Sequence, residues 1–322
     1  MMSPKANILC LLEILRRFSD EAHILSMEDI QKRMLSEYGM SIDRRAVYSN
    51  LAVLCDFGYD ISMYADNKKG YFLREREFEP SEIHLLADAV YSSSFIPERA
   101  TYDLIKKLQK TQSDYFARRI KSMTFVRPDA KTANKEIFYN IEVLDDAISK
   151  GAQVSFNYLR YDLDKKLVLR RDTEYVVSPY AIVWTNEKYY LIGYYEKYSG
   201  ISHFRIDKIK NIQILSEKAK PQDKDFSPYE YAKTAIYMYG SGAQRIELLC
   251  DMCILDDVID RFGKDIDIKP FGENRFKARI FASPGGVRFW ALQYLQFCEV
   301  AAPAELRDEI SGIIKQGIAK YC

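Results

Sequence analysis

Short helical patterns open the chain. The apolar positions of the first pattern recur three or four residues apart, at Ile8, Leu11, Leu12, Ile14, Leu15 and Phe18. Ser26 followed by Asp29 predicts the capped start of a second helix, which ends near Gly39. Asp43 can cap a third helix, whose expected buried face consists of Val47, Leu51, Leu54 and Cys55.

Two short β patterns follow, over residues 61–64 and 71–73, and residues 66–70 between them favour a turn. A hairpin after three helices, with a short connection between the second and third, is the winged helix-turn-helix arrangement. Residues 81–91, 97–110 and 113–123 then read as helices. Between Glu98 and Lys131 nine Lys or Arg residues stand against four Asp or Glu, which fits either a solvated helical face or a phosphate-contacting surface.

An amphipathic helix is expected at residues 136–150, and after it the sequence pattern changes from helical to β. Five short aromatic and β-branched segments are predicted as strands, at residues 154–158, 174–184, 188–195, 203–206 and 211–215. Short strands at this spacing indicate a small open barrel. Residues 221–242 read as a connector with one short helix. Alternating strands and helices complete the chain, at residues 246–250, 256–262, 266–270, 276–281, 286–294 and 304–321.

Composition narrows the class of protein only slightly. The chain is 48% hydrophobic and 29% charged, as globular proteins are, and no run of about 18 apolar residues predicts a membrane span. No secretion signal is recognised, and the scattered cysteines suit buried, reduced thiols, so a cytoplasmic location is expected. The net charge of +1 does not by itself indicate nucleic-acid binding, although a sum over the whole chain can hide a local basic surface.

Cys250 and Cys253 have the spacing of half a zinc site. A structural zinc site needs two further ligands, and neither a second cysteine pair nor a nearby histidine follows. An amphipathic strand that runs into a helix is the better interpretation.

Residues 178–193 and 203–209 closely resemble the WYL domain. The tripeptide that names the family stands here as Tyr189-Tyr190-Leu191, with tyrosine in place of tryptophan, and the Phe-Arg-x-Asp-x-Ile run is intact at residues 204–209. The resemblance extends to the winged helix before WYL domains and to the winged C-terminal extension after them. It implies a bacterial transcriptional regulator whose WYL domain, an SH3-like (Sm-like) β-barrel, binds a nucleic-acid or nucleotide-like effector.

The expected fold is therefore α+β, in four parts. Residues 1–77 form the winged helix-turn-helix and residues 78–132 a helical connector. Residues 133–220 form the WYL barrel, and residues 221–322 a connector with the αβ winged extension.

The third helix supplies the candidate DNA contacts. In a helix-turn-helix its first turn enters the major groove, where Arg44 and Arg45 can hold guanine or phosphate. Tyr48 can reach a phosphate and Ser49 a base edge, while Lys68 and Lys69 at the hairpin tip would touch phosphates. Many relatives carry a threonine after the arginine pair and Arg-Asp two residues further on. Here Ala46 and then Ser49-Asn50 replace them.

The candidate effector contacts lie in the barrel. His203, Arg205 and Asp207 alternate, which predicts one shared strand face, where Asp207 would orient Arg205 toward a phosphate. A buried Arg205–Asp207 pair that closes the barrel is the structural alternative. Tyr158 and Tyr190 either stack on a base or belong to the core, and Ser178 would add a hydroxyl.

Catalysis is not expected, because the chain has no phosphate-binding glycine loop, no nucleophile elbow and only three histidines. No cofactor is expected either. The predicted partners are a double-stranded DNA operator, a nucleotide or short single-stranded nucleic-acid effector, and a second copy of the chain in a homodimer. The rival interpretation is a nucleic-acid-binding accessory protein of a defence system such as CRISPR.

Overall fold

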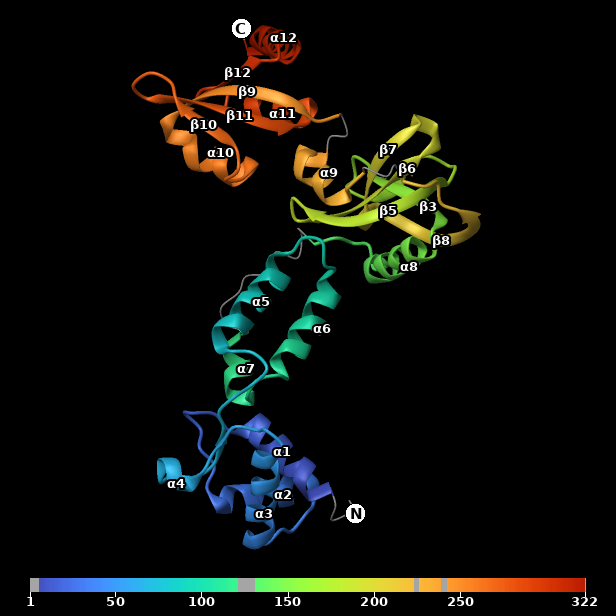
Figure 1. Ribbon diagram of the computed structural model, residues 1–322. Helices are drawn as coiled ribbons and strands as arrows, with labels where there is room; N and C mark the ends of the chain where they lie inside the picture. Colours follow the sequence, from blue (N-terminus) through green and yellow to red (C-terminus); the bar gives the residue numbers. More distant parts are fainter. Residues whose placement is uncertain (1–5, 121–130, 223–225, 239–241, 322) are drawn as a thin grey trace. The chain divides into compact units, whose positions relative to one another are not determined.

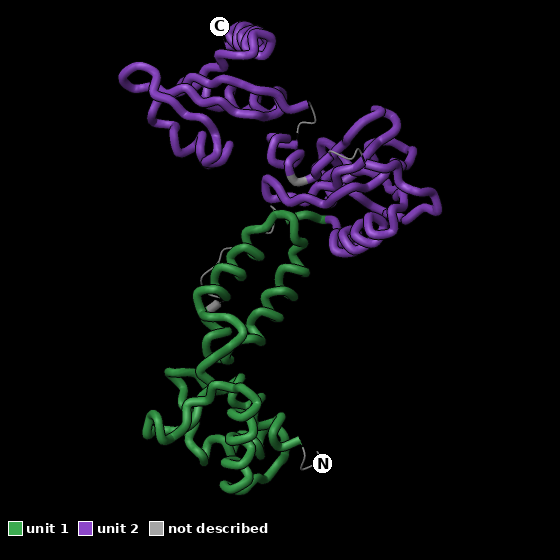
Figure 2. Tube along the Cα trace, in the orientation of Figure 1, with its two compact units in different colours: residues 1–133 green, residues 134–322 purple. Residues whose placement is uncertain are grey.

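A computed structural model describes residues 6–120, 131–222, 226–238 and 242–321 (Figure 1). Blocks of helices and blocks of strands alternate, so the fold is α+β, as the sequence predicts. The chain divides into two compact units, residues 1–133 and 134–322 (Figure 2). The finer four-part division stays a prediction. Among the described residues, no helix combines the length and the apolar character that a membrane span requires.

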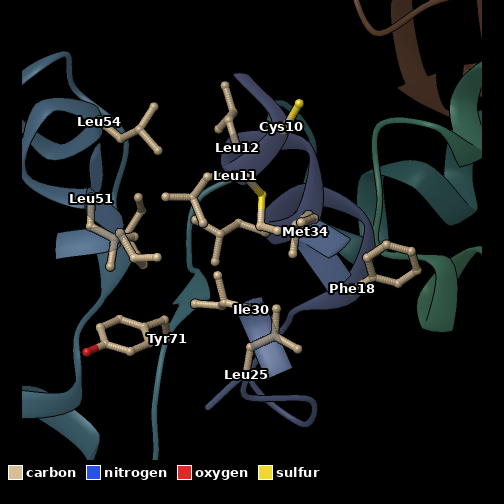
Figure 3. Packing of buried hydrophobic residues seen from close by; sticks show 14 of the residues in the cluster. Cys10, Leu11, Leu12, Phe18, Leu25, Ile30, Met34, Leu51, Leu54 and Tyr71 are labelled. Atoms are coloured by element: carbon tan, nitrogen blue, oxygen red, sulfur yellow. The ribbon is translucent and has the colours of Figure 1, made fainter. Parts of the chain in front are cut away.

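The N-terminal unit opens with three helices and a two-stranded antiparallel hairpin. These are α1 (Asn7–Phe18), α2 (Met27–Tyr38), α3 (Arg44–Asp56), β1 (Ile61–Ser62) and β2 (Phe72–Leu73). Both expected caps are present, because Ser26 and Asp29 form a capping box and Asp43 accepts a hydrogen bond from the backbone of Ala46. The helices pack on a common apolar core (Figure 3).

Two expectations for this unit are wrong. Cys55 is exposed, because the buried stripe of α3 is limited to Val47, Leu51 and Leu54, which are spaced to share one side of the helix. Tyr64 does not extend the first strand but begins a short helix, α4 (Tyr64–Asn67), in the hairpin connection. The carboxylate of Asp66 accepts from the backbone of Met63, a local hydrogen bond that competes with the sheet ladder.

The helices α5 (Pro80–Ser92), α6 (Glu98–Gln109) and α7 (Asp114–Ile120) follow. The expected end of the third helix at Met123 lies outside the described residues. Side chains around α7 bind the winged helix within this unit. Ser113 donates to Asp20 at 2.6 Å, and the ring of Tyr115 stacks on that of His23 at 3.6 Å between centroids.

The second unit begins with α8 (Ile137–Lys150) and a curled antiparallel sheet. Its strands are β3 (Ala152–Tyr161), β4 (Leu167–Leu169), β5 (Tyr175–Thr185), β6 (Lys188–Tyr195), β7 (Gly200–Arg205) and β8 (Ile209–Lys218). The order is β4-β3-β5-β6-β7, and β8 also pairs with β3, so β3 has three partners along its length. The sequence patterns missed β4, a three-residue strand. Clustered aromatic rings fill the interior, namely Phe156, Tyr158, Tyr175, Tyr195 and Phe204.

A connector with α9 (Pro228–Thr234) and the 3-10 helix η5 (Ile236–Met238) leads to a four-stranded sheet of order β10-β11-β9-β12. The elements of this block are β9 (Gln244–Asp251), α10 (Leu255–Phe262), β10 (Asp267–Pro270), β11 (Arg275–Ala282), α11 (Pro284–Gln293), β12 (Cys298–Ala302) and α12 (Ala304–Tyr321). The edge strand β12 was not predicted. Cys250 lies in β9, which ends at Asp251, and Cys253 lies in the 3-10 turn Met252–Ile254 just before α10, so the strand-to-helix interpretation of the cysteine pair is confirmed.

Candidate nucleic-acid interface and effector site

The first turns of α3 present polar side chains to solvent. Arg44, Arg45, Tyr48 and Ser49 are all exposed. Neither arginine forms a salt bridge within the described parts of the chain. The ring of Tyr48 meets the buried Tyr71 edge-on, at 6.4 Å between centroids, which steadies one side of the helix surface. Two guanidinium groups without a carboxylate partner in the described parts of the chain therefore lie at the capped start of α3.

The two lysines of the hairpin connection are also exposed, but they follow α4 instead of lying at a bare turn. Lys68 takes a left-handed backbone conformation with φ of 59°, and its ammonium donates to the carbonyl of Ala65 at 2.9 Å. Asn67 accepts from the backbone N–H groups of Lys69 and Gly70 and so holds the turn. The side chain of Lys68 is thus partly engaged by its own loop.

In the second unit Arg205 and Asp207 form a bidentate pair. Arg205 Nε donates to Asp207 Oδ1 at 3.0 Å, and Arg205 Nη2 donates to Oδ2 at 2.7 Å. The Asp207 side chain is only 4% exposed, against 35% for Arg205. The hydrogen bonds to Asp207 raise the pKa of the Arg205 guanidinium. The structural alternative weighed for this pair, a buried ion pair, is therefore present.

The expectation that Asp207 shares a strand face with His203 and Arg205 is wrong. Strand β7 ends at Arg205, and Asp207 lies in the 3-10 helix η4 (Ile206–Lys208). Two buried asparagines hold this turn from outside the sheet. Asn134 donates to the carbonyls of Asp207 and Ile209, at 3.1 and 2.7 Å, and Asn140 of α8 donates to Ile209 at 2.8 Å.

Two lysines next to the pair were missed as site residues. Lys208 is buried, and its ammonium lies 3.3 Å from the ring centroid of Tyr161. It has no hydrogen-bond partner among the described residues, and burial lowers its pKa to about 8. Burial also lowers the pKa of Lys188, assisted by the nearby charge of Arg205. The signal was available for Lys208, which directly follows Asp207 in the family run.

His203 lies two residues before Arg205 and packs against the connector. Its ring is 5.3 Å from that of Tyr231, between centroids, and it has a hydrogen bond with the backbone of Met238. Burial lowers the pKa of His203 to about 4, so the imidazole is neutral at pH 7. Its Nε2 is buried and has no hydrogen-bond partner in the described part of the chain.

The three remaining candidates have different environments. Tyr190 is half-buried and packs with Ile192 and Met238 on the side of the sheet that faces the connector. Tyr158 belongs to the aromatic core, where its hydroxyl accepts from the backbone of Arg205 at 3.0 Å and burial raises its pKa to about 12. It therefore offers no open ring face, and of the two roles weighed for it the core role holds.

Ser178 is also enclosed. Its hydroxyl accepts from the backbone of Lys220 at 2.9 Å and from Gln153 at 3.4 Å. Because these bonds tie β5 to neighbouring segments, we leave Ser178, together with Tyr158, out of the direct ligand contacts considered below.

The family of the curled sheet and of the helix before it follows from a comparison with family models. Residues 139–214 match the family model of that domain. This part of the chain is thus a WYL domain.

None of the curated proteins with which we compared the chain matches it. Two solved structures are similar to it. Proteasome accessory factor B/C (PafBC) of Arthrobacter aurescens is 16% identical with a TM-score of 0.27, over 98% of this chain and 49% of PafBC. A CRISPR Cas-related protein is 13% identical with a TM-score of 0.39, over 99% of this chain and 81% of that one. The chain therefore spans about half the length of PafBC.

Proposed function

We propose that this protein is a cytoplasmic, DNA-binding transcriptional regulator, in which α3 contacts a DNA operator and the WYL domain senses an effector. One observation carries the proposal. Arg44 and Arg45 are exposed and, among the residues that the structure describes, have no carboxylate partner at the capped start of the third helix of a winged-helix arrangement. That end of the helix is the one that enters the major groove in helix-turn-helix proteins. Because such regulators match two-fold operators, we propose a homodimer.

The effector in this proposal carries negative charge. Three cationic side chains, Lys188, Arg205 and Lys208, lie near the buried carboxylate of Asp207, and Glu187 lies near Lys188. A phosphate would offset the excess positive charge, and charge-assisted hydrogen bonds to guanidinium are strong. Of the two tyrosines first considered for stacking, Tyr190 keeps a half-buried ring on which a base can stack. This combination favours a nucleotide or a short single-stranded nucleic acid.

The connector offers a route for the response inside the second unit. His203 and Tyr190 lie against α9 and η5, and η5 packs on the start of α11. The contact with α11 is tight, because a Cβ at Gly286 would lie 2.4 Å from the carbonyl oxygen of Ile236. An effector that displaces α9 from His203 would move η5 with it. Such a ligand acts only if it binds one arrangement better than the other.

In the N-terminal unit the helical connector would pass the response to the DNA-reading part. The contacts of Ser113 and Tyr115 with Asp20 and His23 couple α7 to the segment after α1. No catalytic step is part of the proposal.

A gel-shift assay of the full chain tests the proposal. The duplex is the DNA upstream of the protein's own gene, with an unrelated duplex of the same length as the control. We expect specific retardation that short single-stranded oligonucleotides change. Equal retardation of both duplexes at every salt concentration would argue against an operator-binding regulator.

The second candidate is a nucleic-acid-binding accessory protein, favoured by the position of the cation cluster in the WYL domain rather than in the winged helix. This second candidate function predicts that the protein binds single-stranded oligonucleotides tightly and that these oligonucleotides do not change its binding to duplex DNA. The same assay therefore separates the two candidates.

A further inference from the structure

Cys250 and Cys298 face each other across two neighbouring strands of the C-terminal sheet. They are direct partners in the antiparallel register of β9 and β12. Their sulfur atoms are 3.5 Å apart, and both residues are buried, Cys250 completely and Cys298 to within 5%. Nothing in the proposed DNA-binding or effector-sensing role uses this pair.

The hydrogen-bond pattern shows which type of cross-strand position the pair occupies. The backbone N–H of Asp251 donates to the carbonyl of Phe297 at 2.9 Å, so the neighbouring pair is a hydrogen-bonded one. Hydrogen-bonded and non-hydrogen-bonded pairs alternate in an antiparallel ladder, which makes the cysteine pair non-hydrogen-bonded. Consistently, the N–H of Cys298 donates to Tyr294, not across the strands.

Side chains are closest at such positions. The Cα atoms of a non-hydrogen-bonded pair are about 4.5 Å apart. A disulfide needs about 4.4–6.8 Å between the Cα atoms. The backbone is therefore already at a separation at which the two sulfur atoms can bond after small side-chain rotations.

Cys298 also has an approach from solvent. It lies on the edge strand of the sheet and lines a groove of about 440 Å³ between α11 and α12. Leu295, Arg307 and Ile314 line the same groove. A small oxidant can therefore reach Cys298 after slight opening of the edge strand, whereas Cys250 lies behind it.

We propose that Cys250 and Cys298 form a redox-active pair that hydrogen peroxide converts to a cross-strand disulfide. The sulfur of Cys298 attacks one oxygen of the peroxide, the O–O bond breaks, and a sulfenic acid and one water result. The thiol of Cys250 then attacks the sulfenic sulfur and releases a second water. The protein loses two protons and two electrons, and the peroxide becomes two waters.

Oxidation would tie the edge strand β12 to the central strand β9, and with it the start of α12, which follows at Ala304. Contact with Cys250 and burial raise the pKa of the Cys298 thiol. Because the thiolate is the reacting form, the reaction is slow at neutral pH and accelerates as the pH rises. The pair would thus respond to sustained oxidation rather than to brief exposure.

Peptide mapping of the peroxide-treated full chain tests the proposal. Cys250 and Cys253 share the tryptic peptide 246–261, and Cys298 lies in 289–307. The variant Cys253→Ala, which replaces the exposed neighbour, therefore makes the assignment unique. We expect a linked 246–261/289–307 species in wild type and in this variant. We also expect the Tm of the transition of this block to rise by about 5–10 °C, with reversal by dithiothreitol.

Two alanine variants complete the test, since alanine suits the apolar surroundings. Cys298→Ala should form no link. Cys250→Ala should retain a Cys298 sulfenic acid, which dimedone traps. Loss of the link in Cys253→Ala, or a folded wild type with no link after excess peroxide at pH 8, would overturn the proposal. Both readouts are independent of DNA binding, so they stand apart from the proposed regulatory function.

Discussion

The arginines of α3 and the arginine of the WYL domain differ in exposure and in pairing. Arg44 and Arg45 on α3 are exposed and have no carboxylate partner among the described residues. Arg205 is half-buried and tied by two hydrogen bonds to the buried Asp207. An exposed cation keeps its hydration until DNA binds, and it can then replace a counterion condensed on a DNA phosphate. The half-buried guanidinium of Arg205 is already paired before any ligand arrives, and its two hydrogen bonds give it a fixed position.

The C-terminal sheet shows why a count of cations does not identify a site. Its strand β11 carries Arg275, Lys277 and Arg279 on one face. Each of them forms a salt bridge, with Asp251 or with Glu247, at 2.9–3.2 Å. Glu299 and Asp267 add two further salt bridges, so these three positive charges are already balanced within the sheet. For this reason we propose α3, and not β11, as the DNA-contacting surface.

The largest effect is expected on α3. Arg44→Ala and Arg45→Ala together should weaken specific DNA binding by about 2–6 kcal/mol, since each base-contacting arginine contributes about 1–3 kcal/mol. Because both side chains are exposed, the Tm should be unchanged. Fluorescence anisotropy with labelled operator gives the Kd, and thermal unfolding provides the control. A folded double variant with the wild-type Kd would remove α3 as the recognition helix.

A smaller effect, on stability instead of DNA affinity, is expected at Arg205. Arg205→Ala leaves the buried carboxylate of Asp207 unpaired, which should lower the free energy of unfolding by about 2–3 kcal/mol. Asp207→Asn in the same chain should restore most of the loss, because it removes the buried charge. Chemical denaturation measures both variants. An equally unstable double variant would show that the charge of Asp207 is not the cause.

The neutral His203 predicts a pH-dependent stability. Its pKa is about 4 in the folded chain, below its ordinary value of 6.5. The unfolded chain therefore binds more protons between these values, and stability is lost as the pH falls through that window. We expect a loss of about 1–2 kcal/mol between pH 7 and 4, allowing for solvent access. Denaturation of His203→Gln, which cannot titrate, should lack this component; an identical pH profile would contradict the assignment.

The smallest effect is expected at the hairpin connection. Lys68→Ala should weaken binding to all duplexes by less than about 1 kcal/mol and lower the salt slope of log K by about one. Asn67→Ala is a useful comparison, because it removes the turn contacts and not the charge. A sequence-dependent loss in Lys68→Ala would instead indicate a base contact.

The sequence predicted the helical site better than the buried one. The polar face of α3 follows from helical periodicity and from the Asp43 cap, both of which are local. Only neighbours of the stripe, such as Cys55, were misplaced. The hairpin connection was harder to predict from the sequence, because it forms a helix that the hydrogen bond from the Met63 backbone to the Asp66 carboxylate stabilises.

The buried site depends on contacts that no local pattern contains. Simple alternation placed Asp207 on a strand, whereas Asn134 and Asn140, some seventy residues earlier, hold it in a 3-10 turn. The burial of Lys208 and the core position of Tyr158 also result from the curled sheet. Likewise β4 and β12, with three and five residues, are too short to show a periodic signal.

The central claim is that an anionic effector in the WYL domain controls DNA binding by α3. Its most direct test is the Kd of the full chain for its operator, titrated with a short single-stranded oligonucleotide. Arg205→Lys serves as the matched variant, since it keeps the charge and loses the bidentate geometry. We predict a saturable change of about 5–150-fold in Kd for wild type and a much smaller change for the variant. An operator Kd that the oligonucleotide leaves unchanged, although it binds the WYL domain, would contradict the account.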